Sequence, residues 1–223
     1  MDRTVQEKYA NLILKKGVNL QKNQPLFISA PIEGIEFVKI LTKKAYELGA
    51  KEVHIEWEDD ELTKLKYTYA ADEVFERYPE WKKMMRESFA EEGAAFVSIY
   101  ATDPDLLQDV DPNRVATATK ASGAALKKFR DYVMNDKVTW TVVSIPAKGW
   151  AKKVFPNQAS EEAVELLWKE IINIVRLDEE DPLAAWDKHN AMLEKAHQIL
   201  NEKQYDKLIF TAPGTNLEVG LPK

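Results

Sequence analysis

The chain has 223 residues, of which 45% are hydrophobic, 30% charged and 10% aromatic. This composition is typical of a globular protein with a substantial core and excludes a disordered or fibrous chain. The 31 basic and 37 acidic residues leave a net charge of −6, which disfavours nucleic acid and anionic membranes as partners. The absence of cysteine excludes disulfides, thiolate metal sites and cysteine nucleophiles, and it favours a cytoplasmic location.

Predicted helices and strands alternate along the chain. Helices are expected near residues 5–16, 33–48, 61–91, 112–134, 160–175 and 182–201, and strands near 25–30, 52–57, 95–100, 138–145 and 207–211. Asp111-Pro112 and Asp181-Pro182 each place a capping side chain before a proline at the first helical position. Strands separated by helices favour parallel pairing, so the sequence predicts a three-layer α/β/α fold with a mainly parallel sheet.

The glycines argue against the usual nucleotide-binding motifs of such folds. None of the eight glycines lies two residues from another, so neither the dinucleotide fingerprint nor the phosphate loop can be formed. Gly34 at a predicted helix start leaves an anion site open, but Glu33 and Glu36 would repel an anion. A plain strand-to-helix turn is the favoured interpretation of this segment.

The three histidines lie far apart in the sequence. His54 and Glu56 share one face of a predicted strand, and we expect this to be the polar face of an edge strand rather than half of a metal site. Glu194 and His197 share a helix face, whereas His189 lies about two turns, or about 12 Å, from His197. A solvated helix surface is therefore favoured there over a metal site.

The acidic segment 56–61 follows a predicted strand and holds five carboxylates in six residues. Such a loop could bind a hard cation, or Asp59 or Asp60 could cap the following helix. The cap is the favoured interpretation.

Aromatic residues follow another predicted strand. Trp150, Val154 and Phe155 are expected in a loop after the strand at 138–145, where α/β proteins meet ligands and partners. The alternative is that these side chains fold back over the sheet edge.

Several short segments match one protein family in the same order. They are YANL at 9–12, GVNLQK at 17–22, AYELGA at 45–50, WEDD at 57–60, WAKKVFP at 150–156, LW at 167–168, DPLAAW at 181–186 and GTNL at 214–217. Together they span nearly the whole chain, which thereby resembles the thermophilic metallo-aminopeptidases, aminopeptidase T and aminopeptidase S.

The resemblance implies a part of a longer enzyme. Residues 1–212 would be its N-terminal α/β domain, and residues 213–223 would begin the connection to a C-terminal catalytic domain. The parent enzyme would release N-terminal amino acids from peptides with two divalent metal ions, zinc, cobalt or similar, and would be a cytoplasmic homodimer. The family's metal ligands lie beyond the Gly-Thr-Asx-Leu segment, so the resemblance assigns no catalytic or metal-binding residue to this chain.

The resemblance and the loop positions together select candidate interdomain or cavity-lining residues. These are Trp57, Asp59, Asp60, Trp150, Thr215 and Asn216. The family usually has aspartate where this chain has Asn216, so a carboxylate role at that position is in doubt. The alternative function is a stand-alone binding or oligomerisation module without catalysis.

Overall fold

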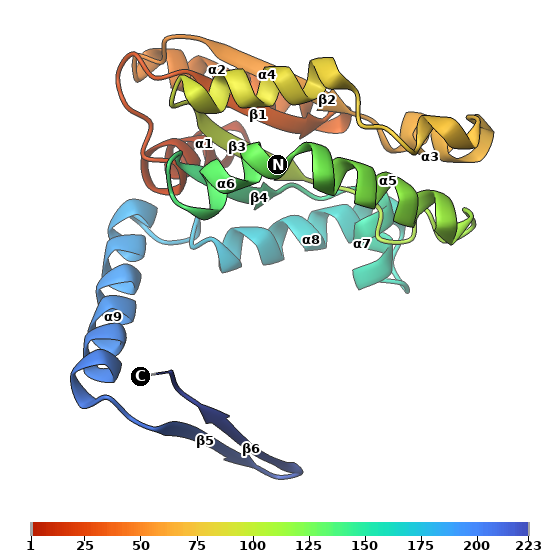
Figure 1. The fold of residues 1–223 in the computed structure, drawn as a ribbon. Coiled ribbons are helices and arrows are strands. Elements are labelled where there is room, and N and C mark those ends of the chain that lie inside the picture. The colour runs from red at the N-terminus through yellow and green to blue at the C-terminus, as the bar shows by residue number, and fades with distance from the viewer. Residues whose placement is uncertain (1, 223) are drawn as a thin grey trace. The chain divides into compact units, whose positions relative to one another are not determined.

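The computed structural model describes residues 2–222 and contains two compact units, which divide between residues 180 and 181 (Figure 1). The end residues 1 and 223, which belong to the predicted ranges 1–212 and 213–223, lie outside the described residues. Each unit is considered by itself.

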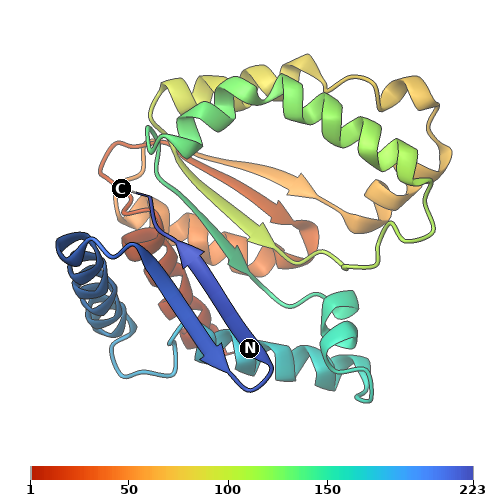
Figure 2. The ribbon, with the colours of Figure 1, turned by 60° about the horizontal axis from the view of Figure 1, so that its bottom comes forward.

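The first unit is built on a four-stranded parallel sheet. Its strands are β1 (Leu26–Pro31), β2 (Val53–Glu58), β3 (Ala95–Tyr100) and β4 (Trp140–Ser144), in the order β2-β1-β3-β4. Leu26 is in register with both Val53 and Ala95, so the strands run side by side and end at one edge (Figure 2). The predicted parallel sheet is confirmed.

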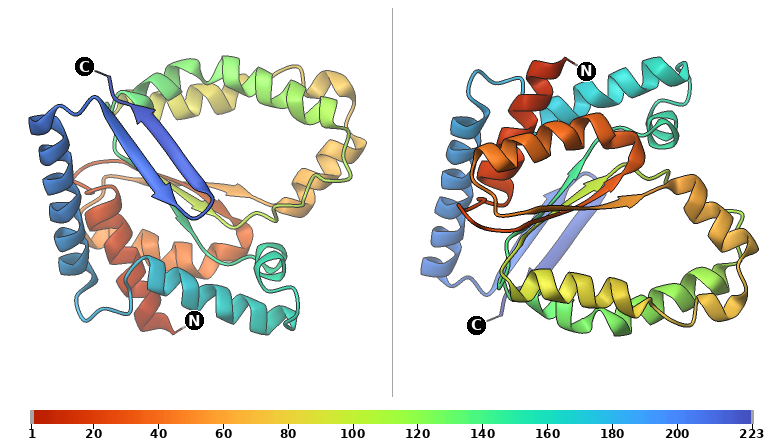
Figure 3. Two further views of the ribbon diagram at one scale, coloured as in Figure 1. Left: turned by 90° about the horizontal axis from the view of Figure 1, so that it is seen from below. Right: turned by 90° about the horizontal axis from the view of Figure 1, so that it is seen from above.

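Helices cover both faces of this sheet. They are α1 (Arg3–Leu12), α2 (Ile35–Glu47), α3 (Asp60–Tyr69), α4 (Glu80–Glu91), α5 (Pro112–Ala125), α6 (Lys127–Met134), α7 (Lys148–Val154) and α8 (Ser160–Ile174). Helices α1, α2 and α8 lie on one face, and α4, α5 and α6 lie on the other (Figure 3). This arrangement confirms the predicted three-layer α/β/α class.

The core divides between the two faces because strand residues alternate. Phe27 and Phe96 pack with Ala90 and Val138 beneath α4 and α6. On the opposite face Ile28 is fully buried, and so is Tyr9 of α1, whose ring stacks on Phe37 of α2 with the centroids 5.3 Å apart. Both helical layers are thus fixed to the sheet by large apolar side chains.

Two long predicted helices are interrupted. Residues 61–91 form α3 and α4 with a 3₁₀ turn at Asp72–Val74 between them, because Pro79 disfavours a continuous helix and instead precedes α4. Residues 112–134 form α5 and α6, which divide at Leu126. There the Arg130 side chain donates a hydrogen bond to the Gly123 carbonyl at 2.8 Å.

The Asp-Pro helix starts are confirmed. Asp111 accepts a hydrogen bond from the Asn113 amide at 2.9 Å, and α5 begins at Pro112. Asp181 accepts from the amides of Leu183 and Ala184 at 3.0 and 3.1 Å at the start of α9 (Pro182–Lys203). Both caps are local in sequence, which is why the sequence predicts them well.

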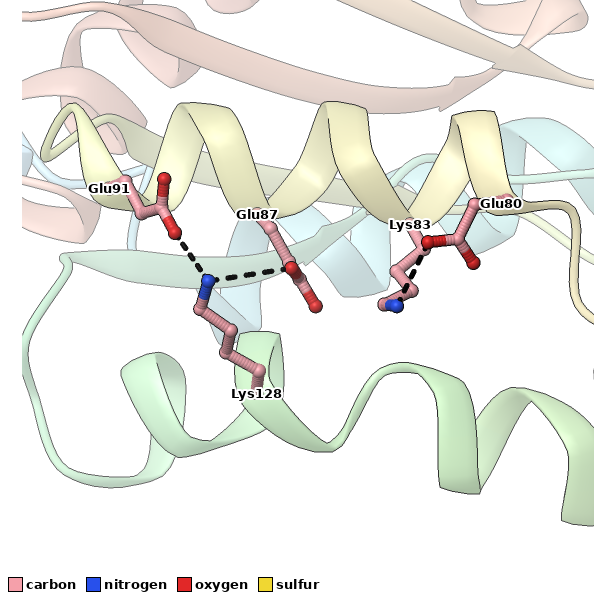
Figure 4. Close-up of polar contacts among 5 residues, drawn as sticks. All are labelled: Glu80, Lys83, Glu87, Glu91 and Lys128. Carbon is pink, nitrogen blue, oxygen red and sulfur yellow. Dashed lines mark hydrogen bonds and ion pairs between the residues drawn. The ribbon is translucent and has the colours of Figure 1, made fainter.

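Ion pairs join α4 to α6 on the outer surface of the second helical layer. Lys128 of α6 lies 3.6 Å from Glu87 and also pairs with Glu91, both of α4 (Figure 4). Within α4, Lys83 pairs with Glu80 at 3.0 Å. These pairs are largely exposed, so they fix the position of α6 more than they stabilise the fold.

The second unit consists of α9 and a hairpin of β5 (Lys207–Ala212) and β6 (Thr215–Gly220). The hairpin is antiparallel, with Ala212 in register with Thr215. The predicted strand at 207–211 exists but does not join the parallel sheet, because the two-residue turn Pro213-Gly214 can connect only antiparallel strands. Gly214 has a φ of +77°, which the missing side chain permits.

Candidate functional site

The candidate site lies at the edge where the four parallel strands end. The chain leaves β1 toward β2 and leaves β3 toward β4, so the strand order reverses between β1 and β3. In doubly wound sheets, loops at such a point form the binding crevice. The segment 101–110 after β3 and helix α7 after β4 both begin at this edge.

A cavity of about 450 Å³ opens between these two segments. Its lining residues are Tyr100, Thr102, Asp103, Pro104, Leu106, Leu107, Ser144 and Trp150. Two aromatic rings and three aliphatic residues supply most of the lining, with one carboxylate and two hydroxyl groups among them. This volume and chemistry are within the usual range for small-molecule sites.

The segment 101–110 is held from both sides. The Asp60 carboxylate at the start of α3 accepts a hydrogen bond from the Asp103 amide at 2.9 Å. Asp103 accepts in turn from the Asp105 amide at 2.9 Å, and Lys153 of α7 donates to Asp105 at 2.7 Å. The loop that forms one wall of the cavity is therefore connected to both α3 and α7.

Gly149 allows α7 to approach this loop closely. A Cβ atom at Gly149 would lie 2.4 Å from Cγ and 2.5 Å from Oδ2 of Asp103, so any larger residue would displace the carboxylate. The glycine is therefore required by the packing of α7 against the loop.

The acidic segment is a helix start rather than a cation loop. Asp59 caps α3 by accepting from the Leu62 amide at 2.7 Å, which confirms the favoured interpretation. Asp60 reaches Asp103, as described above. Trp57 lies near the end of β2 with 39% of its surface exposed, and neither Trp57 nor Asp59 lines the cavity.

The placement of Trp150 differs from the sequence prediction. Trp150 and Val154 belong to helix α7 and not to a loop, because the segment after β4 closes a helical turn from Ala147 to Ala151 and packs Ala151 into the interior. Phe155 follows as the residue after the helix. Among the six candidate residues, Trp150 is the one that lines the cavity.

Thr215 and Asn216 belong to the second unit. They begin β6 and lie in register with Ala212 and Thr211 of β5, and both are exposed. Their position after the hairpin turn fits an exposed docking segment and contributes no group to the cavity described above.

The polar face of β2 is not a solvent face. β2 is an edge strand as predicted, but α4 covers His54 and Glu56, and Glu56 is only 8% exposed. Lys82 lies 2.9 Å from the Glu56 carboxylate, and Arg86 donates a hydrogen bond to it. Burial alone would raise the pKa of Glu56, but Lys82 and Arg86 outweigh it and lower the pKa below its ordinary value.

No group of three or more His, Cys, Asp or Glu side chains that could hold a metal ion occurs within residues 2–222. Glu194 and His197 are both exposed on α9, with 3.8 Å between Oε1 and Nδ1, as expected for a helix surface. The residues described here therefore do not fit a metal pair. In the same stretch no helix is long and apolar enough to cross a membrane.

Sequence reasoning missed most of the cavity. Tyr100, Thr102, Asp103, Leu106 and Leu107 were not candidates, because no periodicity marks a loop. The one available signal was Thr102-Asp103-Pro104 directly after a predicted strand, since turn-forming residues at a strand end are typical of this edge.

The fold and the cavity at the carboxyl edge define a doubly wound α/β protein. Comparison of the sequence with protein families is more specific. The chain belongs to the thermophilic metalloprotease (M29) family, whose sequence profile matches residues 3–223. The resemblance inferred from the short segments is thereby confirmed.

The relatives of the chain are named aminopeptidases. It is 46% identical to Aminopeptidase 2 of Geobacillus stearothermophilus over 215 residues, which are 96% of this chain and 52% of that protein. It is 37% identical to Aminopeptidase T of Thermus thermophilus, covering 96% of this chain and 53% of that protein. The solved structure of wild-type AmpT from Thermus thermophilus matches with a TM-score of 0.90 and 35% identity over 98% of this chain and 54% of that one. The chain thus spans about half the length of these relatives.

Proposed function

We propose that this chain is the N-terminal, non-metal-binding domain of a divalent-metal-dependent aminopeptidase that releases N-terminal amino acids from peptides. The observation that carries the proposal is the family match over residues 3–223 combined with coverage of about half of each relative. The two metal ions, zinc, cobalt or similar, would be bound by the other half of the parent enzyme. The chain by itself would be inactive.

The proposed domain comprises residues 1–212, and residues 213–223 begin the connection to the catalytic domain. Support comes from the apolar face of the hairpin, where the register places Phe210 beside Leu217, and both side chains are 51% exposed. A two-stranded hairpin is only marginally stable alone, so a further surface packed on this face would stabilise it.

The proposed contact with the catalytic domain or with a dimer partner includes Trp57, Asp59, Asp60, Trp150, Thr215 and Asn216. Trp57 and Trp150 support it because exposed tryptophans at the end of a parallel sheet are typical of interfaces. A cytoplasmic homodimer is the proposed state of the parent, consistent with the absence of cysteine.

The test combines this chain with the second half of Aminopeptidase 2 from Geobacillus stearothermophilus, produced separately. We expect a complex in size-exclusion chromatography and release of leucine from a leucyl peptide with zinc or cobalt, whereas this chain alone releases none. Metal-dependent release by the chain alone, or no complex between the two halves, would contradict the proposal. The second result would favour the stand-alone module.

Trp150→Ala tests the proposed contact. We expect it to weaken the complex about tenfold or more, as loss of a central interface tryptophan does, while the stability of the chain changes little. The matched control is Trp140→Ala, because Trp140 is 43% exposed at the opposite end of β4. A large loss of stability in Trp150→Ala would instead identify Trp150 as a core residue.

A further inference from the structure

The cavity beside Trp150 contains a carboxylate without a counter-charge. Asp103 makes no ion pair with any residue in 2–222, and its Oδ1 accepts from the Asp105 amide. Its neighbours are engaged, because Asp105 pairs with Lys153 and Asp60 accepts from the Asp103 amide. Asp103 is thus the carboxylate that remains available to a ligand at the cavity.

The remaining lining selects the rest of the ligand. Tyr100 and Trp150 offer aromatic rings, and Pro104, Leu106 and Leu107 offer aliphatic surface. Aromatic faces attract cations, and the apolar surface favours a hydrophobic group. A cation with an attached apolar group would match both parts of the lining.

A divalent metal ion fits this site poorly. Hard cations require several oxygen ligands, whereas the cavity lining contributes one carboxylate. An anion is disfavoured by the same carboxylate. The polarity of the site therefore favours an organic cation.

From these features we propose that the cavity lined by Tyr100, Asp103, Leu107 and Trp150 binds a primary ammonium group attached to a branched or aromatic apolar group. Asp103 accepts hydrogen bonds from the ammonium, and the rings and aliphatic side chains surround the apolar part. This inference does not rest on the proposed function, since it concerns binding by this chain alone.

The connections of the loop make the site preformed. Asp60 and Lys153 hold the loop between α3 and α7, and Gly149 lets α7 pack directly on the Asp103 side chain. A preformed wall reduces the entropy lost when a ligand binds.

The proposal is tested by NMR titration of the ¹⁵N-labelled chain with phenethylamine. We expect saturating shifts of the Trp150 indole and of the amides of Thr102 and Leu107. Ethylbenzene sulfonate and ethylamine, which lack the ammonium or the ring, are expected to bind at least about tenfold more weakly. Equal binding of the sulfonate, or no saturable shift with phenethylamine, would overturn the proposal.

Two further probes distinguish the natural sources of such a group. Leucinamide represents the amino terminus of a peptide, and Nα-acetyl-lysinamide represents a lysine side chain. Preference for leucinamide assigns the site to amino termini, and preference for the lysine derivative assigns it to side chains. Both results support binding of an apolar ammonium, whereas binding of neither contradicts it.

Asp103→Asn is the decisive variant, because asparagine retains the oxygen that accepts from Asp105 but removes the charge. We expect about a tenfold loss of phenethylamine affinity with unchanged thermal unfolding. The matched control is Asp109→Asn in the same loop, whose side chain lies outside the cavity and 3.7 Å from Lys64. Unchanged affinity in Asp103→Asn would refute the role of this carboxylate.

Discussion

At the scale of single residues, Tyr9 connects the first helix to an edge of the sheet. Its hydroxyl donates to the Ser144 carbonyl at 3.1 Å and accepts from the Ser144 amide at 3.3 Å. Burial raises the pKa of Tyr9 to about 12, although the backbone contact with Ser144 acts in the opposite direction. The hydroxyl therefore remains protonated and satisfies two backbone groups of β4.

Tyr9→Phe is expected to lower the free energy of unfolding by about 1 kcal/mol, because the Ser144 backbone loses its partner. The contribution linked to the raised pKa is fully present below pH 10, the ordinary pKa, and is lost as pH rises through about 12. Urea unfolding at neutral pH measures the first effect, and Tyr69→Phe, with Tyr69 80% exposed, is the control. A neutral Tyr9→Phe would show that water replaces the hydroxyl.

Glu56 offers a second test, because it is nearly buried between Lys82 and Arg86. Glu56→Gln is expected to cost about 3 kcal/mol, since both cations lose their counter-charge. The lowered pKa means that this contribution is present above about pH 4.5 and is lost as pH falls through the folded-state pKa. Thermal unfolding from pH 7 to pH 3 should show a smaller acid dependence in the variant, with the exposed Glu76→Gln as control.

At the scale of elements, the approach of α7 to the loop after β3 depends on Gly149. Gly149→Ala is expected to destabilise the chain by about 1–3 kcal/mol, because the new methyl group would overlap the Asp103 carboxylate. Gly123→Ala in α5 is the matched control, since its Cβ would meet only Arg130 at 3.6 Å. Alanine there should stabilise the helix by up to about 1 kcal/mol. Equal effects of the two substitutions in chemical unfolding would contradict the packing argument.

The elements also show what a sequence can predict. The Asp111 and Asp181 caps depend on residues two or three positions away, so the sequence predicts both helix starts. The pairing of β5 depends on whether the chain turns back at Pro213-Gly214 or continues to another element, which its own residues do not specify. The strand was therefore predicted correctly and its partner was not.

The candidate site shows the same limit. Asp59 and Asp60 were recognised from an acidic run after a strand, and Trp150 from an aromatic residue after another. Asp103 came from a third segment, and its contacts with Asp60 and Gly149 join residues more than forty positions apart. Such contacts follow from the strand order, which periodicity alone does not determine.

At the scale of the whole molecule, the division after residue 180 predicts unequal stability. Within 182–220, Pro182 is the one residue with a buried side chain, whereas the first unit contains nearly all of the core. A chain of residues 1–180 is expected to unfold cooperatively with a midpoint close to that of the full chain. Limited proteolysis of the full chain should first cleave within 181–223. Early cleavage inside the first unit would contradict this order.

The tyrosine contacts at the two outer strands have a consequence for self-association. Tyr9 occupies the amide and carbonyl of Ser144 on β4, and Tyr46 accepts from the Val53 amide on β2 at 3.2 Å. The outer strands of an open sheet are templates on which strands of other molecules can assemble. By engaging backbone groups at both borders, these hydroxyls act as guards against intermolecular β-pairing, so their loss would favour fibrillar aggregation as well as unfolding.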